Sequence, residues 1–190
     1  MRSGLIGLAL AFASLATAAS GAQFKPAPNQ TFTLDLDTQA GNFSLWRADD
    51  ISRLDALRAD IAFVRWRDDP KWAPSFHIDL VNGPESVNFT VIADREKNRL
   101  YTTLETWRGG KQLAQELYVF GPVLGEKFSL DLNWAADGTV TAVVRDRAAQ
   151  AMKGFERHVA KLGSAPTSLQ IFNSTGEVKF DALQLGRTPP

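Results

Sequence analysis

The chain has 190 residues, and its 21 Lys and Arg side chains balance 21 Asp and Glu side chains, so the formal net charge at pH 7 is zero. This balance argues against electrostatic attraction to nucleic acid or to an anionic membrane, and we expect neither as a partner. The sequence has no cysteine, which excludes disulfides, thiol nucleophiles and thiolate metal sites together.

Residues 1–22 have the pattern of a secretory signal peptide. Arg2 supplies a positive charge, Leu5–Ala13 form an apolar run, and the small residues Ser20, Gly21 and Ala22 follow. A cut after Ala18 fits nearly as well, and the apolar run is too short to span a bilayer. We therefore expect a secreted protein, periplasmic or extracellular, with no membrane span.

The remaining chain has a length typical of one domain with a well-buried core. A linker is predicted over 23–30, where Pro26 and Pro28 lie, followed by one domain over 31–187 and a short tail over 188–190. Nothing in the pattern indicates the oligomeric state.

Short segments of alternating apolar and polar residues recur throughout this domain, with Gly, Asn, Asp or Pro in most of the gaps. Such a pattern predicts an all-β fold, a two-sheet antiparallel β-sandwich or jelly roll. The predicted strands cover 32–36, 42–47, 60–67, 75–81, 87–93, 100–108, 112–120, 128–134, 139–145, 168–173 and 177–185.

Two hairpins are predicted near the C-terminus. The first joins 128–134 to 139–145 through a turn at Asp137 and Gly138. The second joins 168–173 to 177–185 through a turn at 173–176. The segment 148–162 is ambiguous, because its apolar residues follow helical spacing while Gly154 weakens a helix. We favour an extended segment there and keep one short helix as the alternative.

The C-terminal layout carries a family resemblance. A strand "EKFSLDLNW", an Asp-Gly turn, "TVTAVV" and then "APTSLQIFNSTGEVKFDALQLG" resemble the concanavalin A-like lectin/glucanase superfamily, including laminin-G-like jelly rolls. The earlier stretch "LRADIAFVRWRDDPKWAPSFHIDLVNG" is similar to the middle strands of that superfamily. The resemblance implies a jelly roll whose concave sheet often binds glycans, and it does not by itself imply catalysis.

The chain also departs from that superfamily. It lacks the Glu-x-Asp-x-x-Glu strand motif of the glucanase branch. Its acidic pairs, at 49–50 and 68–69, do not have the ligand spacing of a calcium site. We expect no metal site and no cofactor, with calcium left open as an alternative.

A further hairpin is predicted at Gly109 and Gly110. A two-residue turn there pairs Trp107 with Gln112, Glu105 with Ala114, Thr103 with Glu116 and Tyr101 with Tyr118. Glu105 and Glu116 then become diagonal neighbours flanked by aromatic rings. A carboxyl pair beside aromatic rings is typical of the active site of a glycoside hydrolase. We favour the simpler interpretation, in which these residues lie on a solvated sheet face.

Strand alternation predicts one polar face. Arg65 and Arg67 share a side with Phe63, and Val64 and Trp66 take the core side. His77 and Asp79 alternate with apolar neighbours in the next strand. We expect these groups to share a sheet face whose candidate ligand-binding residues are Arg65, Arg67, His77, Asp79, Tyr101, Glu105, Trp107 and Tyr118.

Such a face predicts a lectin-like protein that binds an oligo- or polysaccharide without covalent chemistry. Rings stack on sugar faces, while Arg, His and carboxylates bond hydroxyls or a uronic carboxylate. One alternative is a glycoside hydrolase or polysaccharide lyase that uses Glu105 with Glu116, or His77 with Tyr101. The other is a structural or adhesion module that binds protein.

Overall fold

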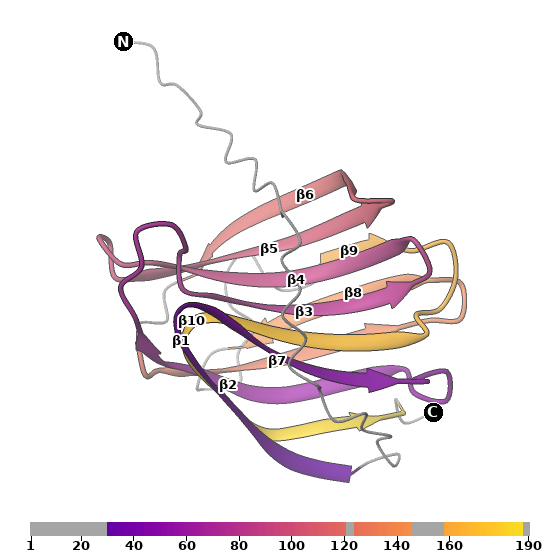
Figure 1. The fold of residues 1–190 in the computed structure, drawn as a ribbon. Helices are drawn as coiled ribbons and strands as arrows, with labels where there is room; N and C mark the ends of the chain where they lie inside the picture. Colours follow the sequence, from indigo (N-terminus) through magenta and orange to yellow (C-terminus); the bar gives the residue numbers. More distant parts are fainter. Residues whose placement is uncertain (1–29, 121–123, 146–157, 188–190) are drawn as a thin grey trace.

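The computed structural model describes residues 30–120, 124–145 and 158–187, and β-strands make up its regular structure (Figure 1). Every pair of neighbouring strands is antiparallel, and the described ranges contain no helix. The all-β antiparallel sandwich is therefore confirmed. The strands are β1 (Gln30–Asp49), β2 (Ala56–Trp66), β3 (Ser75–Asn82), β4 (Glu85–Asp94), β5 (Arg99–Arg108), β6 (Lys111–Phe120), β7 (Lys127–Trp134), β8 (Thr139–Arg145), β9 (His158–Lys161) and β10 (Ser168–Gly186).

The long strands β1 and β10 belong to both layers of the sandwich. Residues 168–174 of β10 pair with β3, whereas residues 176–186 pair with β2, and β1 runs along the other edge of β10. The first sheet therefore has the order β1-β10-β3-β4-β5-β6, and the second has the order β1-β10-β2-β7-β8-β9. Figure 1 shows β7, β8 and β9 behind the strands of the first sheet.

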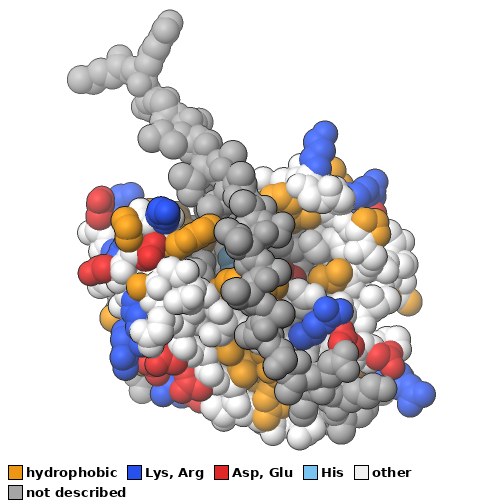
Figure 2. Space-filling model, viewed as in Figure 1, with side chains coloured by type: hydrophobic (Ala, Val, Ile, Leu, Met, Phe, Trp, Pro, Cys, Tyr) orange, Lys and Arg blue, Asp and Glu red, His pale blue; other side chains and the backbone are white. Residues whose placement is uncertain are grey.

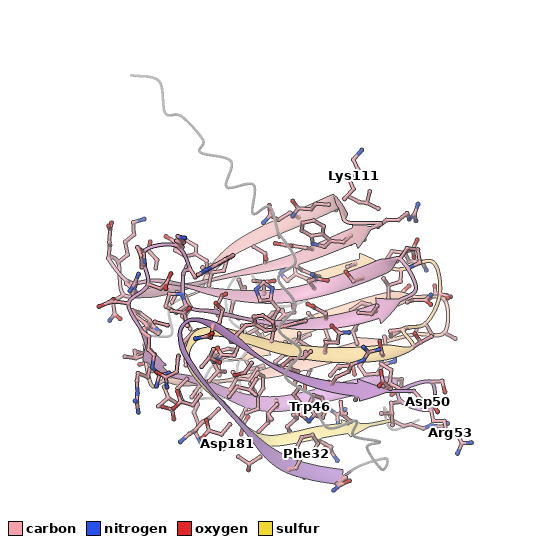
Figure 3. The ribbon with its side chains drawn as sticks, in the orientation of Figure 1. Phe32, Trp46, Asp50, Arg53, Lys111 and Asp181 are labelled. Atoms are coloured by element: carbon pink, nitrogen blue, oxygen red, sulfur yellow. The ribbon has the colours of Figure 1, made fainter. Side chains whose placement is uncertain are left out.

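The core fills the space between the two sheets. Alternate residues point inward, as in β3, where Phe76, Ile78 and Leu80 are fully buried. Where β1 folds over at the edge, Phe32 and Trp46 pack with ring centroids 5.6 Å apart (Figure 3). The bulkiest fully buried side chains of this core are those of Phe63, Phe76, Phe89, Phe128 and Phe180.

Both glycine hairpins are present. Trp134 pairs with Val140 across the turn that contains Gly138, and Trp107 pairs with Gln112 across Gly109 and Gly110. All three glycines have positive φ, between 56° and 82°, which other residues adopt only with strain.

The predicted hairpin over 168–185 is wrong, because this segment is the single bent strand β10. The bend lies at Thr175, which has φ of 55°, and at Gly176, whose missing Cβ leaves room for the ring of Phe63. Beside it the buried Asn173 amide donates to the carbonyl oxygens of Leu36 (2.7 Å) and Gly176 (2.8 Å). The chain thus changes direction without reversing, and it passes from the first sheet into the second.

The ambiguous segment is extended where it is described. Residues 158–161 form β9, which pairs with β8 from Thr139 to Ala142. The rest of that segment, up to residue 157, lies outside the described residues, as do 1–29.

Candidate functional site

The outward faces of the two sheets differ in how their charged side chains are paired. On the second sheet, charged side chains neutralise one another in a lattice of ion pairs, as where Lys179 lies 3.4 Å from Asp35 and 3.3 Å from Glu177. Other pairs of this lattice are Arg65–Glu177, Arg58–Asp131, Arg145–Asp131 and Lys127–Asp181. A lattice of this kind is typical of a solvated surface.

The outward face of the first sheet, which we call the polar face, is built from residues in register across its strands. Arg47, Gln170, Asp79, Asn88, Glu105 and Gln115 form one row. Leu45, Phe172, His77, Thr90 and Thr103 form the next. Figure 2 views this side of the molecule.

Glu105 is fixed by three hydrogen bonds. Thr103 Oγ1 donates to it at 2.8 Å, Gln115 Nε2 at 3.1 Å, and the indole Nε1 of Trp107 at 2.8 Å. Trp107 is half-buried, and the bond from its ring nitrogen sets the plane of the ring. The carboxylate of Glu105 therefore orients an accessible aromatic surface on the polar face.

Asp79 and Asn88 face each other on β3 and β4 in the middle of the row. Asp79 Oδ1 and Asn88 Oδ1 are buried, and neither has a hydrogen-bond partner within the described part of the chain. Burial raises the pKa of Asp79 to about 7, and the negative charge of Glu105 adds to the shift. Unsatisfied buried acceptors are uncommon in folded proteins and point to a group that arrives from outside.

His77 lies next to Asp79 on the same face. Its Nδ1 is 3.0 Å from Thr90 Oγ1, and burial lowers its pKa to about 4. The imidazole is therefore neutral at pH 7, and the centre of the polar face carries no positive charge from it.

Aromatic side chains lie toward both ends of the polar face. Phe43, which is 52% exposed, packs on Phe172 with ring centroids 6.4 Å apart. Tyr101 lies in the same row as Phe43, and Trp107 lies about 20 Å farther along β5. The face thus has ring surfaces at separated points along its strands and polar groups between them.

The structure places Arg65 and Arg67 away from this face, so that part of the prediction is wrong. They belong to β2 and its end, where Arg65 pairs with Glu177 and Arg67 with Asp37, on the second sheet. A bulge at Val64 interrupts the alternation, and it puts Phe63 fully in the core.

The predicted register of the β5–β6 hairpin is correct only next to the turn. A bulge shifts it beyond Trp107, so that Glu105 pairs with Gln115 and Thr102 pairs with Tyr118. Glu116 falls opposite Leu104, whose side chain is in the core, and not on the pleat of Glu105. The register from which the Glu105–Glu116 pair was predicted is therefore wrong.

His77 and Tyr101 share the polar face but do not act as a pair. They lie two strands apart and one row apart, about 12 Å between Cα atoms. The Tyr101 hydroxyl donates instead to Asp94 Oδ2 at 3.2 Å, and Lys97 lies over its ring.

The structure brings His77, Asp79, Tyr101, Glu105 and Trp107 onto one face, and a role for them in binding stays a prediction. Sequence reasoning missed other members of the face, namely Asn88, Thr90, Gln115, Gln170 and Phe172. The Asn-Gly pair at 82–83 was the available signal for two of them, because a tight turn there sets Asp79 opposite Asn88 and His77 opposite Thr90.

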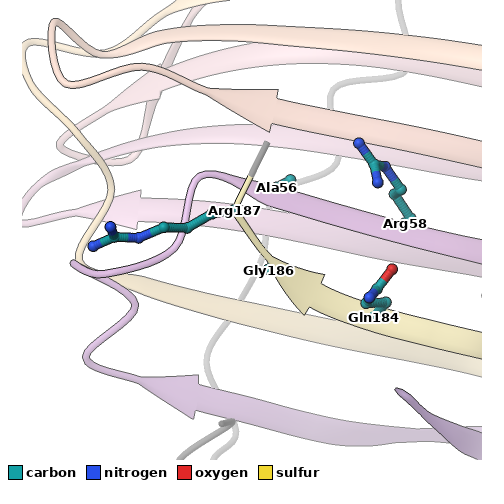
Figure 4. Close-up of a pocket in the computed structure, with 5 residues that line it drawn as sticks. All are labelled: Ala56, Arg58, Gln184, Gly186 and Arg187. Carbon is teal, nitrogen blue, oxygen red and sulfur yellow. The ribbon is translucent and has the colours of Figure 1, made fainter. Parts of the chain in front are cut away.

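A small depression lies elsewhere, at the ends of β2 and β10 (Figure 4). Its volume of about 10 Å³ is room for about one water molecule, so it is too small for a sugar. The residues that line it are Ala56, Arg58, Gln184, Gly186 and Arg187.

Over residues 30–120, 124–145 and 158–187, no three His, Asp or Glu side chains gather closely enough to hold a metal ion. The expectation of no cofactor, with calcium left open, stays a prediction. The same stretches include no helix with the length and apolar character needed to cross a bilayer.

Comparison with known proteins identifies the fold. No family model and no curated protein matches the sequence. Similar solved structures include galectin LEC-6 from Caenorhabditis elegans, with 12% identity over 84% of this chain and 94% of that chain and a TM-score of 0.49. The carbohydrate-binding module CBM66 from Bacillus subtilis has 10% identity over 86% of this chain and 99% of that one, with a TM-score of 0.49.

The Bacteroides ovatus xyloglucan PUL protein GH43B reaches a TM-score of 0.52, with 11% identity over 80% of this chain. The match spans 32% of that longer protein. At such identities the likeness is one of fold. The jelly-roll sandwich implied by the concanavalin A-like resemblance is thus the fold that this chain adopts.

Proposed function

We propose that this protein binds a carbohydrate on the polar face, as a lectin-like β-sandwich of the concanavalin A-like superfamily, without covalent chemistry. The observation that carries the proposal is the juxtaposition of an oriented indole with unsatisfied acceptors. Trp107 is held by Glu105, and Asp79 Oδ1 and Asn88 Oδ1 lie buried and unpartnered among the described residues of the same row.

This combination suits a sugar. The apolar face of a pyranose ring stacks on an aromatic ring, and its hydroxyls bond the few polar groups that fix its orientation. The ion-pair lattice on the second sheet offers no comparable surface, because its charges are already matched.

The proposal includes export to the periplasm or the extracellular space. It is supported by Arg2 and the apolar run Leu5–Ala13 in the sequence. Fractionation of the producing cells, with the mass of the product, tests it. A mature chain that starts at Gln23 outside the cytoplasm is the expected result, and an unprocessed cytoplasmic chain would contradict it.

The binding test uses purified mature protein on a glycan array and in polysaccharide pull-downs that include xyloglucan. Trp107→Ala is expected to weaken binding about fivefold to thirtyfold, because a stacked ring contributes on the order of 1–2 kcal/mol. Trp72→Ala is the matched control, since Trp72 is 39% exposed and lies in the loop between β2 and β3. Loss of binding in the Trp72 variant alone would move the site off the polar face.

The alternatives are tested on the same samples. New reducing ends or unsaturated products from a bound polysaccharide, abolished by Glu105→Gln while binding persists, would replace the lectin-like proposal with a glycoside hydrolase or lyase. Absence of binding to every glycan would favour a structural module that binds protein.

A further inference from the structure

The centre of the polar face has buried hydrogen-bond acceptors that lack a partner among the described residues. The donors of Thr103, Trp107 and Gln115 are all directed at Glu105. The buried oxygens without a partner, Asp79 Oδ1 and Asn88 Oδ1, are both acceptors. A ligand group that satisfies these two oxygens therefore has to donate hydrogen bonds.

The acceptors form a compact line. Asp79, Asn88 and Glu105 are direct neighbours on the adjacent strands β3, β4 and β5, so their Cα atoms are about 5 Å apart from strand to strand. Their side chains are half-buried on one face. The three side chains can therefore contact one small group placed over Asn88.

Cations of the protein do not occupy this position in the described structure. The row ends at Arg47 on β1, and the Nε of that residue lies 2.5 Å from Asp49 Oδ1. Lys97, near Tyr101, bonds Asp94 Oδ2 at 3.1 Å. Arg65 and Arg67 lie on the other sheet. Within the described part of the chain, no basic side chain therefore forms an ion pair with the carboxyl groups at the centre.

We propose that the polar face selects a glycan with a free ammonium group, such as a chain of glucosamine units, and places that group between Asp79, Asn88 and Glu105. This inference rests on the carbohydrate-binding function proposed above. An ammonium group has three donors and no acceptor, which matches a line of acceptors, and its charge compensates the carboxylates. The ring of Trp107 then stacks on the sugar. A uronate or a sulfated sugar brings only further acceptors and negative charge, so this face rejects it.

The test compares three tetrasaccharides by isothermal titration calorimetry at pH 7 and fixed salt: β-1,4-linked glucosamine, the same chain N-acetylated, and galacturonic acid. The glucosamine chain is expected to bind at least tenfold more tightly than its N-acetylated form, and the galacturonate is expected not to bind. Asp79→Asn should weaken glucosamine binding at least tenfold and remove most of the preference for the glucosamine chain over its N-acetylated form.

Asp181→Asn is the matched control for bulk charge. It makes the same carboxyl-to-amide change on β10 in the second sheet, where Asp181 pairs with Lys127 and lies away from the polar face (Figure 3). Its binding should equal that of the parent protein. Equal losses in both variants would overturn the proposal, because the preference would then reflect net charge.

The remaining outcomes distinguish failure of the ammonium site from failure of the proposed carbohydrate binding. Equal binding of the N-acetylated chain, or tight binding of the galacturonate, would overturn the ammonium site while carbohydrate binding stands. The ammonium site also fails if none of the three binds but another glycan on the array binds through Trp107. Absence of binding to any glycan would overturn both.

Discussion

His77 and Asp79 lie two residues apart on β3, and burial acts on them in opposite directions. Removal from water disfavours the charged form of each side chain. The pKa of His77 therefore falls from 6.5 to about 4, and that of Asp79 rises from 3.8 to about 7. At neutral pH the histidine is uncharged, while the aspartic acid is near its midpoint.

These shifts predict opposing effects of pH on the free energy of unfolding. Asp79 holds its proton more tightly when folded, so its contribution is full below about pH 4 and is lost as pH rises toward 7. His77 holds its proton less tightly when folded, so its contribution is full above about pH 6.5 and is lost as pH falls toward 4. Between pH 4.5 and 6 the two slopes oppose each other, and each approaches about 1.4 kcal/mol per pH unit.

Single substitutions should reveal how each residue contributes to the pH dependence of the free energy of unfolding. Relative to the parent protein, the stability of Asp79→Asn is expected to increase with pH between 4.5 and 6, and that of His77→Gln to decrease. Urea unfolding at four pH values in this window measures both. Profiles of the two variants that stay parallel to the parent profile would show that neither group is held as described.

At the scale of elements, tight turns determine where the strands pair. Gly138 has φ of 82°, and a Cβ at this position would lie 2.8 Å from the carbonyl oxygen of Ser164 and even closer to that of Leu162. The Leu162 amide also donates to the carbonyl oxygen of Gly138 at 2.9 Å. The turn between β7 and β8 is therefore packed directly against the chain that leaves β9.

Gly138→Ala is expected to destabilise the protein by about 3 kcal/mol, since it combines backbone strain with a steric clash. Gly110→Ala is the matched control, because Gly110 has a similar φ of 76° but a Cβ added there would meet no atom within 4 Å. Its expected cost is about 1 kcal/mol, from strain alone. Thermal and urea unfolding measure the difference, and equal costs would argue against the contact with the β9 segment.

For the whole molecule, the sharing of β1 and β10 predicts that the two sheets unfold together. Either sheet alone would lack two of its strands, so neither is a separate cooperative unit. Native-state hydrogen exchange should give the same maximal protection to amides in β4, from the first sheet, and in β7, from the second. A lower opening free energy confined to β7, β8 and β9 would contradict a single unit.

Features that depend on neighbouring residues, such as turns, could be predicted from the sequence. Features that depend on pairing between distant strands, such as register, could not. The Gly109–Gly110 and Asp137–Gly138 turns were predictable because turn chemistry is local. The bulge next to Trp107 was not, and one inserted residue moves Glu116 off the pleat of Glu105. The segment 173–176 has the composition of a turn, yet partners on both sides keep β10 a single strand.

The candidate site followed the same rule. Alternation placed His77 and Asp79 on one side of β3 and Glu105 and Trp107 on one side of β5, as the structure has them. The sheet that a strand joins is a property of the whole chain, and Arg65 on β2 was therefore assigned to the wrong layer. The buried acceptor Asn88 became visible only once its neighbours were in place.

The position of β10 has a consequence for the order in which the protein can be made. This strand is the last of the described strands, yet it lies between β1 and β3 in one sheet and between β1 and β2 in the other. A nascent chain that ends before Ser168 has no partner for β1 and no inner neighbour for β2 or β3. Folding of this domain therefore waits until β10 has been synthesised, because loops that span most of the described residues close only when this strand is present.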